Sequence, residues 1–352
     1  MTAAPEPAPG LIERAIDLLA KALNLLGLNG ARLRWKWQQK RRDLGESGLR
    51  SAILWRSATS RYKMCPACRT LVPRSAASCP ECARPLARVR APGFGRLISN
   101  LIPGATAATS LLLLVNGALF VLMLMTTIGS GRSRGLLAAF DPITLVRFGS
   151  GLNLLTIAHG EWWRILTPIF LHGGLLHFGF NSYALLQIGP LVEEEYGTER
   201  FAVVYLVSGI FGNVFSQYLR PYLAQILPWI GPGVHTVGAS GALCGLIGLL
   251  IAYGTRRGGV AGTSLRSGMT QYAVYLLVFS LLPGIDLLCH LGGFLTGFAL
   301  GFLVPAGPLR GPRAGALWEG LLLALVLVIL FAFYRVAAHG AESVRWLMSR
   351  GG

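Results

Sequence analysis

The chain has 352 residues, of which 53% are hydrophobic and only 13% are charged. Apolar runs such as 109–128 and 317–333 are too long for a soluble core, so the composition excludes an ordinary globular protein and indicates an all-α polytopic membrane protein. The formal net charge of +17 would favour nucleic-acid binding in a soluble protein. Half of the 32 basic residues, however, lie between Arg32 and Arg96, just before the first apolar run. That position favours the positive-inside bias over a nucleic-acid site, and we expect no nucleic-acid partner.

The first region, residues 1–60, carries an amphipathic pattern followed by a basic aromatic run. Residues 11–26 place charged side chains around an apolar stripe with a helical period. Residues 34–42 mix tryptophans with Lys and Arg, as interfacial anchors do. Two interpretations stay open: the helix docks on a membrane surface, or it packs on the neighbouring cysteine module or on a partner. Because the first apolar run begins after residue 100, we predict no cleavable signal peptide.

Residues 61–90 contain two Cys-x-x-Cys pairs, Cys65 with Cys68 and Cys79 with Cys82, separated by ten residues. Two such knuckles can place four thiolates tetrahedrally around one Zn²⁺. The alternative is a pair of disulfides, which rarely persist in the cytosol and which the tight spacing suits poorly. We therefore predict a structural zinc ribbon with these four ligands. The sequence does not indicate what the ribbon binds, so a cytosolic partner stays open.

After a linker at 91–108, apolar segments alternate with loops. They predict seven membrane segments, at 109–128, 172–192, 201–219, 239–254, 270–283, 286–304 and 316–337. We assign 109–304 to a core of six helices and 305–352 to a seventh helix with its tail. Basic residues also follow the fourth and sixth segments, which predicts a cytosolic N-terminus and a C-terminus outside.

The first outside loop, 131–165, is long and contains the run Glu161-Trp162-Trp163-Arg164. Tryptophans in such a place suit an interfacial hairpin partly sunk in lipid. No organelle-targeting segment is evident, and the composition is rich in Ala, Gly and Arg. The expected location is therefore a bacterial plasma membrane.

The apolar segment at 239–254 is too short to cross a bilayer. A helix over 239–253 would rise about 22 Å, against a hydrocarbon core of roughly 30 Å. A helix that begins part-way through the membrane leaves its first N–H groups unpaired. A hydroxyl at Ser240, between Gly238 and Gly241, would combine a nucleophile with ready-made donors for an oxyanion.

Three of the predicted segments carry polar groups that are costly in hydrocarbon. They are His172, His177 and Asn181 in the second segment, Ser240 in the fourth and His290 in the sixth. Glycines follow the serine and the last histidine: Gly241, Gly245, Gly248, Gly293 and Gly297. Such small residues would let the fourth and sixth helices pack closely and bring Ser240 near His290. Singly, each polar group has a structural explanation, but together they form a nucleophile, a base and two donors for acyl transfer.

Other hydrolase classes fit less well. No His-Glu-x-x-His motif is present, and His172 and His177 have the wrong spacing for a helical zinc pair. An aspartyl dyad needs two buried aspartates, but only Asp286 lies in a predicted segment, where it would cap the sixth helix. Ser240 is not in a Gly-x-Ser-x-Gly motif, since residue 242 is alanine.

Five motifs occur on these segments in a characteristic order. They are Trp163-Arg164, His172-x4-His177-x3-Asn181, Glu195-Tyr196-Gly197-x2-Arg200-Phe201, Gly238-Ala239-Ser240-Gly241 and His290-x2-Gly293-x3-Gly297. In combination they closely resemble the rhomboid intramembrane serine proteases, across roughly residues 109–304.

The resemblance implies a six-helix core with a Ser–His dyad and no cofactor for catalysis. Ser240 would attack the scissile carbonyl, and His290 would take the serine proton and return it to the leaving amine. His177, Asn181 and the Ser240 N–H would hold the oxyanion, and His172 would tie the first loop to the second helix. The expected substrates are single-pass membrane proteins in the lipid bilayer, cut at or near the outer face after a small residue.

The sequence departs from many members of the family at one point. Many members carry an aromatic residue four positions after the serine, where it packs on the catalytic histidine, but here that residue is Cys244. A seventh helix follows the core, as in part of the family. Two other functions stay open: a catalytically silent scaffold or chaperone that binds membrane helices, and a zinc-ribbon docking protein whose membrane part is only an anchor.

Overall fold

The computed structural model describes most of the chain beyond residue 104 and scattered residues before it. The described residues are 20, 31, 35, 62–64, 70–73, 76, 78–82, 105–132, 135, 139–227, 230–231, 233, 235–282, 284–307 and 312–350. The chain divides into two compact units, Met1–Arg88 and Val89–Gly352, which we describe separately. The predicted N-terminal helix and basic run lie outside the described residues, apart from Ala20 and Trp35.

The described part of the first unit contains a β-hairpin. Strands β1 (Tyr62–Met64) and β2 (Leu71–Pro73) pair antiparallel, with Met64 opposite Leu71. Val72 and Cys79 are fully buried against each other. Cys65 and Cys68 belong to the connection between the strands in sequence, and they lie outside the described residues.

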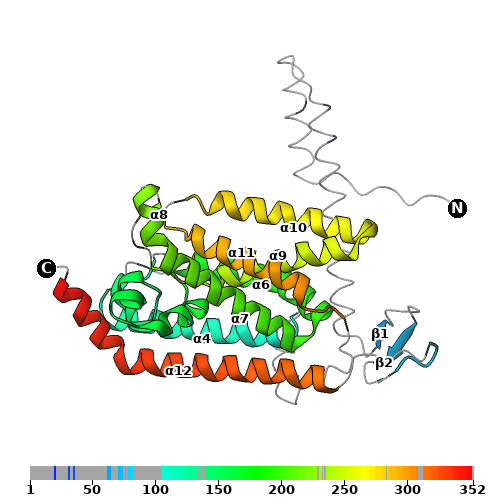
Figure 1. The fold of residues 1–352 in the computed structure, drawn as a ribbon, viewed down its shortest axis with the longest axis horizontal. Coiled ribbons are helices and arrows are strands. Elements are labelled where there is room, and N and C mark those ends of the chain that lie inside the picture. Colours follow the sequence, from blue (N-terminus) through cyan, green and yellow to red (C-terminus); the bar gives the residue numbers. More distant parts are fainter. Residues whose placement is uncertain are drawn as a thin grey trace. The chain divides into compact units, whose positions relative to one another are not determined.

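The second unit is helical in the residues that the structure describes (Figure 1). Its long helices are α4 (Ala107–Gly129), α6 (Leu175–Tyr196), α7 (Thr198–Val214), α9 (Ser240–Arg257), α10 (Gly259–Phe279), α11 (Leu287–Leu303) and α12 (Pro312–Arg350). Short elements connect them: α5 (Pro142–Phe148), the π-helical η1 (Leu154–Ala158) and η4 (Phe215–Leu219), the 3₁₀ turns η2 (Trp162–Ile165) and η3 (Thr167–Phe170), and α8 (Arg220–Ile226). A long helix thus occupies each segment that the apolar pattern predicted.

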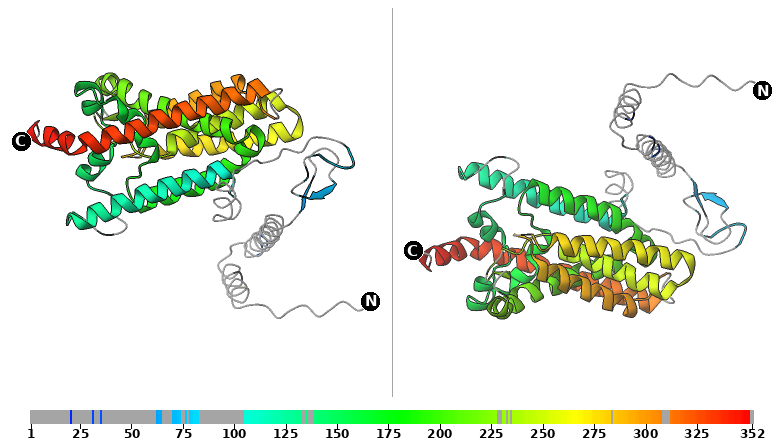
Figure 2. Two further views of the ribbon diagram at one scale, coloured as in Figure 1. Left: turned by 90° about the horizontal axis from the view of Figure 1, so that it is seen from below. Right: turned by 90° about the horizontal axis from the view of Figure 1, so that it is seen from above.

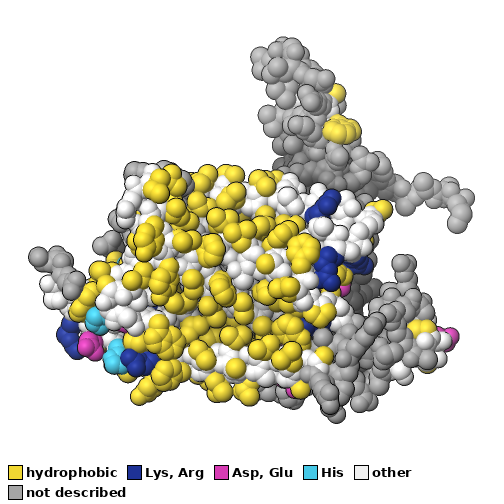
Figure 3. Space-filling model, viewed as in Figure 1, with side chains coloured by type: hydrophobic (Ala, Val, Ile, Leu, Met, Phe, Trp, Pro, Cys, Tyr) yellow, Lys and Arg dark blue, Asp and Glu magenta, His cyan; other side chains and the backbone are white. Residues whose placement is uncertain are grey.

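Three described helical stretches are long and apolar enough to cross a membrane: Ala107–Gly129, Thr198–Ile226 and Ala314–Ser349. Large hydrophobic side chains are exposed along α4, α10 and α12, among them Leu122, Val278 and Leu327. Figure 3 shows one face of the bundle as a broad apolar surface, with charged side chains gathered toward its two ends. Because such a surface is stable only in lipid, the protein is an integral membrane protein.

Helix α9 lies in the middle of this unit and contacts α6, α7, α10 and α11. Figure 2 shows α4 on one side of the bundle and α12 on the other. The most extensive contact joins α9 to α11. Added side chains on Gly293 and Gly297 would run into the carbonyl oxygens of Gly241 and Gly245, respectively. The predicted glycine packing of these two helices is therefore confirmed. Such close packing is expected in a bilayer, because the hydrophobic effect does not drive helices together in lipid.

The first loop is held by α12, which runs well past its predicted end at 337. Glu161 is buried, and it accepts hydrogen bonds from Arg164 Nε (2.5 Å) and from Ser343 Oγ on α12 (2.8 Å). Trp163 is also buried, and the Arg335 guanidinium lies 4.4 Å from the centre of its ring. Of the four residues 161–164, Trp162 is the exposed one. The interpretation of this run as a lipid-sunk hairpin is therefore wrong for Trp163, because α12 covers it.

Candidate active site

Ser240 is the first residue of α9 and is half-buried. The backbone that leads to it is fixed on both sides. Thr236 exchanges two backbone hydrogen bonds with Gly151 of the first loop, and the Gly238 N–H donates to Pro168 O (2.9 Å). Gly238 has φ +120°, a conformation that favours glycine. As a result the hydroxyl stands beside the helix N-terminus, where the first N–H groups have no intrahelical acceptor.

The glycine contact of α9 with α11 brings the first turns of the two helices together. A Cβ atom on Gly241 would lie 2.7 Å from the sulfur of Cys289, the residue before His290. Since Gly241 and Gly245 meet Gly293 and Gly297 in the same order, the two helices run parallel. Ser240 and His290 thus occupy matching first turns, although no hydrogen bond joins these two described residues. Such a catalytic hydrogen bond often forms only with substrate present.

His177 and Asn181 of α6 lie beside Gly238, two positions before Ser240. A Cβ atom on Gly238 would lie 2.7 Å from His177 Nε2 and 3.4 Å from Asn181 Nδ2. His177 Nδ1 accepts a hydrogen bond from the Gly173 N–H (3.2 Å), which leaves Nε2 to carry the proton of the neutral ring. Asn181 Nδ2 is buried and has no partner among the described residues. Two N–H donors therefore lie beside the backbone that leads to Ser240, free to bind an oxyanion.

Asp286 connects the serine segment to the histidine helix. Its Oδ1 accepts from the Cys289 N–H (3.1 Å), so the predicted cap of the sixth helix is confirmed. The same carboxylate accepts hydrogen bonds from the Arg220 guanidinium (2.5 Å) and from Thr236 Oγ1 (2.7 Å). The sequence pattern does not reveal this network, because Arg220 and Thr236 meet Asp286 only through the tertiary fold.

The comparisons place this geometry in a family. Residues 159–306 match the family model described as the rhomboid domain. The putative rhomboid protease YdcA of Bacillus subtilis is 36% identical over 155 residues, which are 44% of this chain and 72% of that protein. The chain belongs to the rhomboid family. The resemblance drawn from the motifs is therefore confirmed at the level of the family.

Longer rhomboids match over a smaller part of their length. The rhomboid protease GluP of Bacillus subtilis is 38% identical over 201 residues, 54% of this chain and 35% of that protein. RHOMBOID-like protein 4 of Arabidopsis thaliana is 32% identical over 211 residues, 56% of this chain and 50% of that protein. This rhomboid thus spans only a third to a half of these relatives. The matched domain contains Ser240, His290, His177, Asn181 and Asp286 and ends before α12.

The remaining predicted residues of this rhomboid lie around the site. His172 is 1% exposed, and its ring packs edge-on against His177 and Phe178 of α6. Arg164 is fully buried and donates to the carbonyl oxygens of Val146 and Ser150 (2.9 and 3.1 Å). Among the described residues, neither side chain hydrogen-bonds to the serine. Arg164 holds two carbonyl oxygens of the first loop, whose Gly151 pairs with the serine segment.

Proposed function

We propose that this rhomboid is an intramembrane serine protease that uses Ser240 and His290 as a dyad. The observation that carries the proposal is the packing of both α6 and α11 against the segment around Ser240. The glycine contact of α9 with α11 supports the approach of Ser240 to His290, and the closeness of Gly238 to His177 and Asn181 supports their role as oxyanion donors. A nucleophile, a base and oxyanion donors are the complete set for acyl transfer.

In the proposed reaction, Ser240 Oγ bonds to the scissile carbonyl carbon as its proton passes to His290 Nε2. The carbonyl oxygen becomes an oxyanion, which the Ser240 N–H, His177 Nε2–H and Asn181 Nδ2–H stabilise. The C–N bond then breaks, and the imidazolium gives its proton to the leaving amine. A water molecule, deprotonated by His290, attacks the acyl ester, and the proton returns to Ser240 as the carboxyl product leaves.

We propose single-pass transmembrane proteins in the lipid bilayer as substrates, cut in or next to their membrane segments. An intact helix hides each carbonyl group in its own hydrogen bonds, so a cleavable segment must unwind. The basic residues of the sequence support a cytosolic N-terminus and a C-terminus outside a bacterial plasma membrane. Catalysis in this proposal needs no cofactor.

The experiment is cleavage of a single-pass reporter by the full chain in proteoliposomes. We expect Ser240→Ala and His290→Ala to abolish cleavage, because each removes a group that forms or breaks bonds. Ser267→Ala is the matched control, since Ser267 is exposed on α10. Helix binding without cleavage by the unsubstituted protein would favour the silent scaffold instead.

We further propose that Cys65, Cys68, Cys79 and Cys82 hold one structural Zn²⁺. The hairpin of β1 and β2 supports this, since its connection contains the first pair in sequence. Burial of Cys79 against Val72 supports a compact module around the second pair. Four thiolates fill a tetrahedral site, so the metal would stabilise the fold and leave no position for catalysis.

A further inference from the structure

A serine outside all the predicted motifs contacts the imidazole of His290. Ser280 follows the last residue of α10 and is 2% exposed. Its Oγ lies 2.5 Å from His290 Nδ1 and 2.5 Å from the backbone carbonyl oxygen of Leu276. The hydroxyl therefore bridges the C-terminal turn of α10 and the ring on α11.

This arrangement fixes the proton on the imidazole. A serine hydroxyl has one hydrogen, and a carbonyl oxygen can only accept, so Ser280 donates to Leu276 O. In the hydrogen bond with His290, the ring Nδ1–H is then the donor and Ser280 Oγ is the acceptor. A neutral imidazole with its proton on Nδ1 has a lone pair on Nε2. That lone pair is what a base for Ser240 requires.

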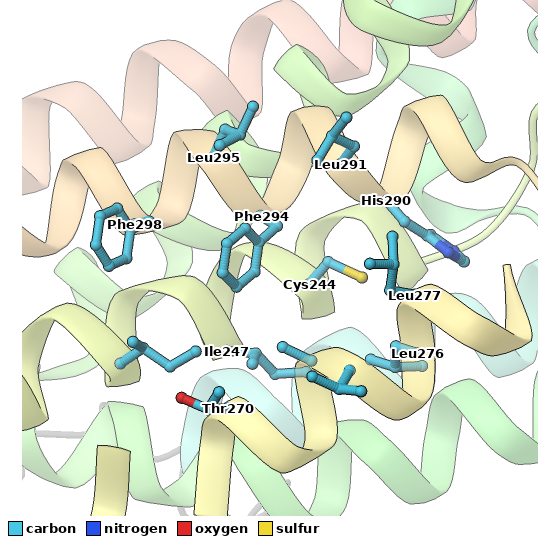
Figure 4. Close-up of a pocket in the computed structure, with 13 residues that line it drawn as sticks. Cys244, Ile247, Thr270, Leu276, Leu277, His290, Leu291, Phe294, Leu295 and Phe298 are labelled. Atoms are coloured by element: carbon cyan, nitrogen blue, oxygen red, sulfur yellow. The ribbon is translucent and has the colours of Figure 1, made fainter. Parts of the chain in front are cut away.

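The ring has little other support on its α9 side. Cys244 and His290 line one cavity of about 450 Å³ between α9, α10 and α11, whose other lining residues are apolar except Thr270 (Figure 4). Figure 4 shows His290 at one end of this cavity and Phe298 at the other. No aromatic ring of the described residues stacks on His290. The hydrogen bond to Ser280 therefore restrains the orientation of the imidazole.

We propose that Ser280 is a positioning residue for His290: its hydroxyl holds the imidazole in the Nδ1–H tautomer and aims Nε2 at Ser240. The inference rests on the proposed protease function. Ser280 does not touch substrate. Its loss should slow the chemical step and leave substrate binding unchanged, because an unheld ring samples both tautomers and other orientations.

The test compares Ser280→Thr with Ser280→Val in the full chain in proteoliposomes. The two replacements have the same shape and differ in the hydroxyl, so a packing defect caused by the added methyl group would affect both. We expect kcat within about threefold of the unsubstituted protein for Ser280→Thr and about tenfold lower for Ser280→Val, with KM unchanged in both. Thr270→Val is the matched control, because Thr270 lines the same cavity and makes the same bond to its own helix, Thr270 Oγ1 to Arg266 O.

The outcomes separate this inference from the proposed function. Equal kcat values for Ser280→Thr and Ser280→Val would overturn the positioning role, and so would a change confined to KM. If Ser240→Ala kept full cleavage, the protease proposal itself would fail.

Replacing Cys244 gives a second measurement: if the ring needs support, Cys244→Phe should restore part of the kcat lost in Ser280→Val. No restoration by this cavity-filling replacement would count against the account.

Discussion

Thr236 Oγ1 donates a hydrogen bond to Asp286 Oδ2 over 2.7 Å, and each partner lies four residues before a member of the proposed dyad. The bond joins the segment that ends at Ser240 to the N-terminus of the helix that carries His290. The Arg220 guanidinium neutralises the same carboxylate. The Thr236–Asp286 hydrogen bond thus joins the two first turns in addition to the glycine contact, and Arg220 supplies the counter-charge of its carboxylate.

Asp286→Asn should destabilise the fold and lower cleavage together. The substitution keeps the shape but leaves the Arg220 charge buried without its counter-ion, which costs about 3–5 kcal/mol. Thermal unfolding and reporter cleavage are the measurements. Asp141→Asn is the control, because Asp141 also caps a helix and pairs with an arginine, but Arg132 is partly exposed. That change should cost about 1 kcal/mol or less, and equal losses for both variants would contradict the role of Asp286.

Gly297→Ala should disrupt the contact of α9 with α11. Its methyl group would run into the Gly245 carbonyl oxygen, a backbone atom that cannot rotate away. Overpacking of this kind costs about 1–3 kcal/mol or more, so we expect a lower unfolding temperature and weaker cleavage. Gly320→Ala on α12 is the control, since nothing lies within 4 Å of the added carbon. An unfolding temperature for Gly297→Ala as high as that of the control would show that the helices are not packed this closely.

Asn181→Ala should lower kcat by about 10²-fold with little change in KM, because it removes a donor that acts mainly on the oxyanion. The measurement is steady-state cleavage of the reporter. Gln225→Ala serves as control, since in the part of the chain that the structure describes this exposed amide donates to its own helix, at Pro221 O. A rise in KM with kcat unchanged would mean that Asn181 binds substrate and does not stabilise the transition state.

The sequence was sufficient for features that depend on local pattern. Apolar length located the helices, glycine spacing predicted the contact of α9 with α11, and Asp286 was recognised as a helix cap. The sequence could not reveal Ser280, because nothing in its neighbourhood distinguishes it from any serine at a helix end. Its role depends on a contact with another helix. The apolar pattern predicts the seventh helix only to residue 337, whereas α12 continues to Arg350, because Ser343 meets Glu161 only in the folded protein.

The zinc proposal predicts one Zn²⁺ per chain in protein purified without chelator. Cys79→Ser should remove most of the bound metal, because three thiolates no longer close the tetrahedral site. Elemental analysis of the purified protein measures this directly. Cys244→Ser is the control, as Cys244 lies on α9. If the metal content were zero, or the same in both variants, the four cysteines would not be a zinc site.

The most direct test of the central claim is the intact mass of the protein after treatment with a fluorophosphonate. Attack by Ser240 Oγ on phosphorus would form a phosphonate ester and expel fluoride, once His290 has taken the serine proton. We predict one adduct per chain, located on Ser240 by peptide mapping, and a loss of labelling in His290→Ala. An adduct on another residue, or labelling of Ser240 that does not depend on His290, would contradict the dyad.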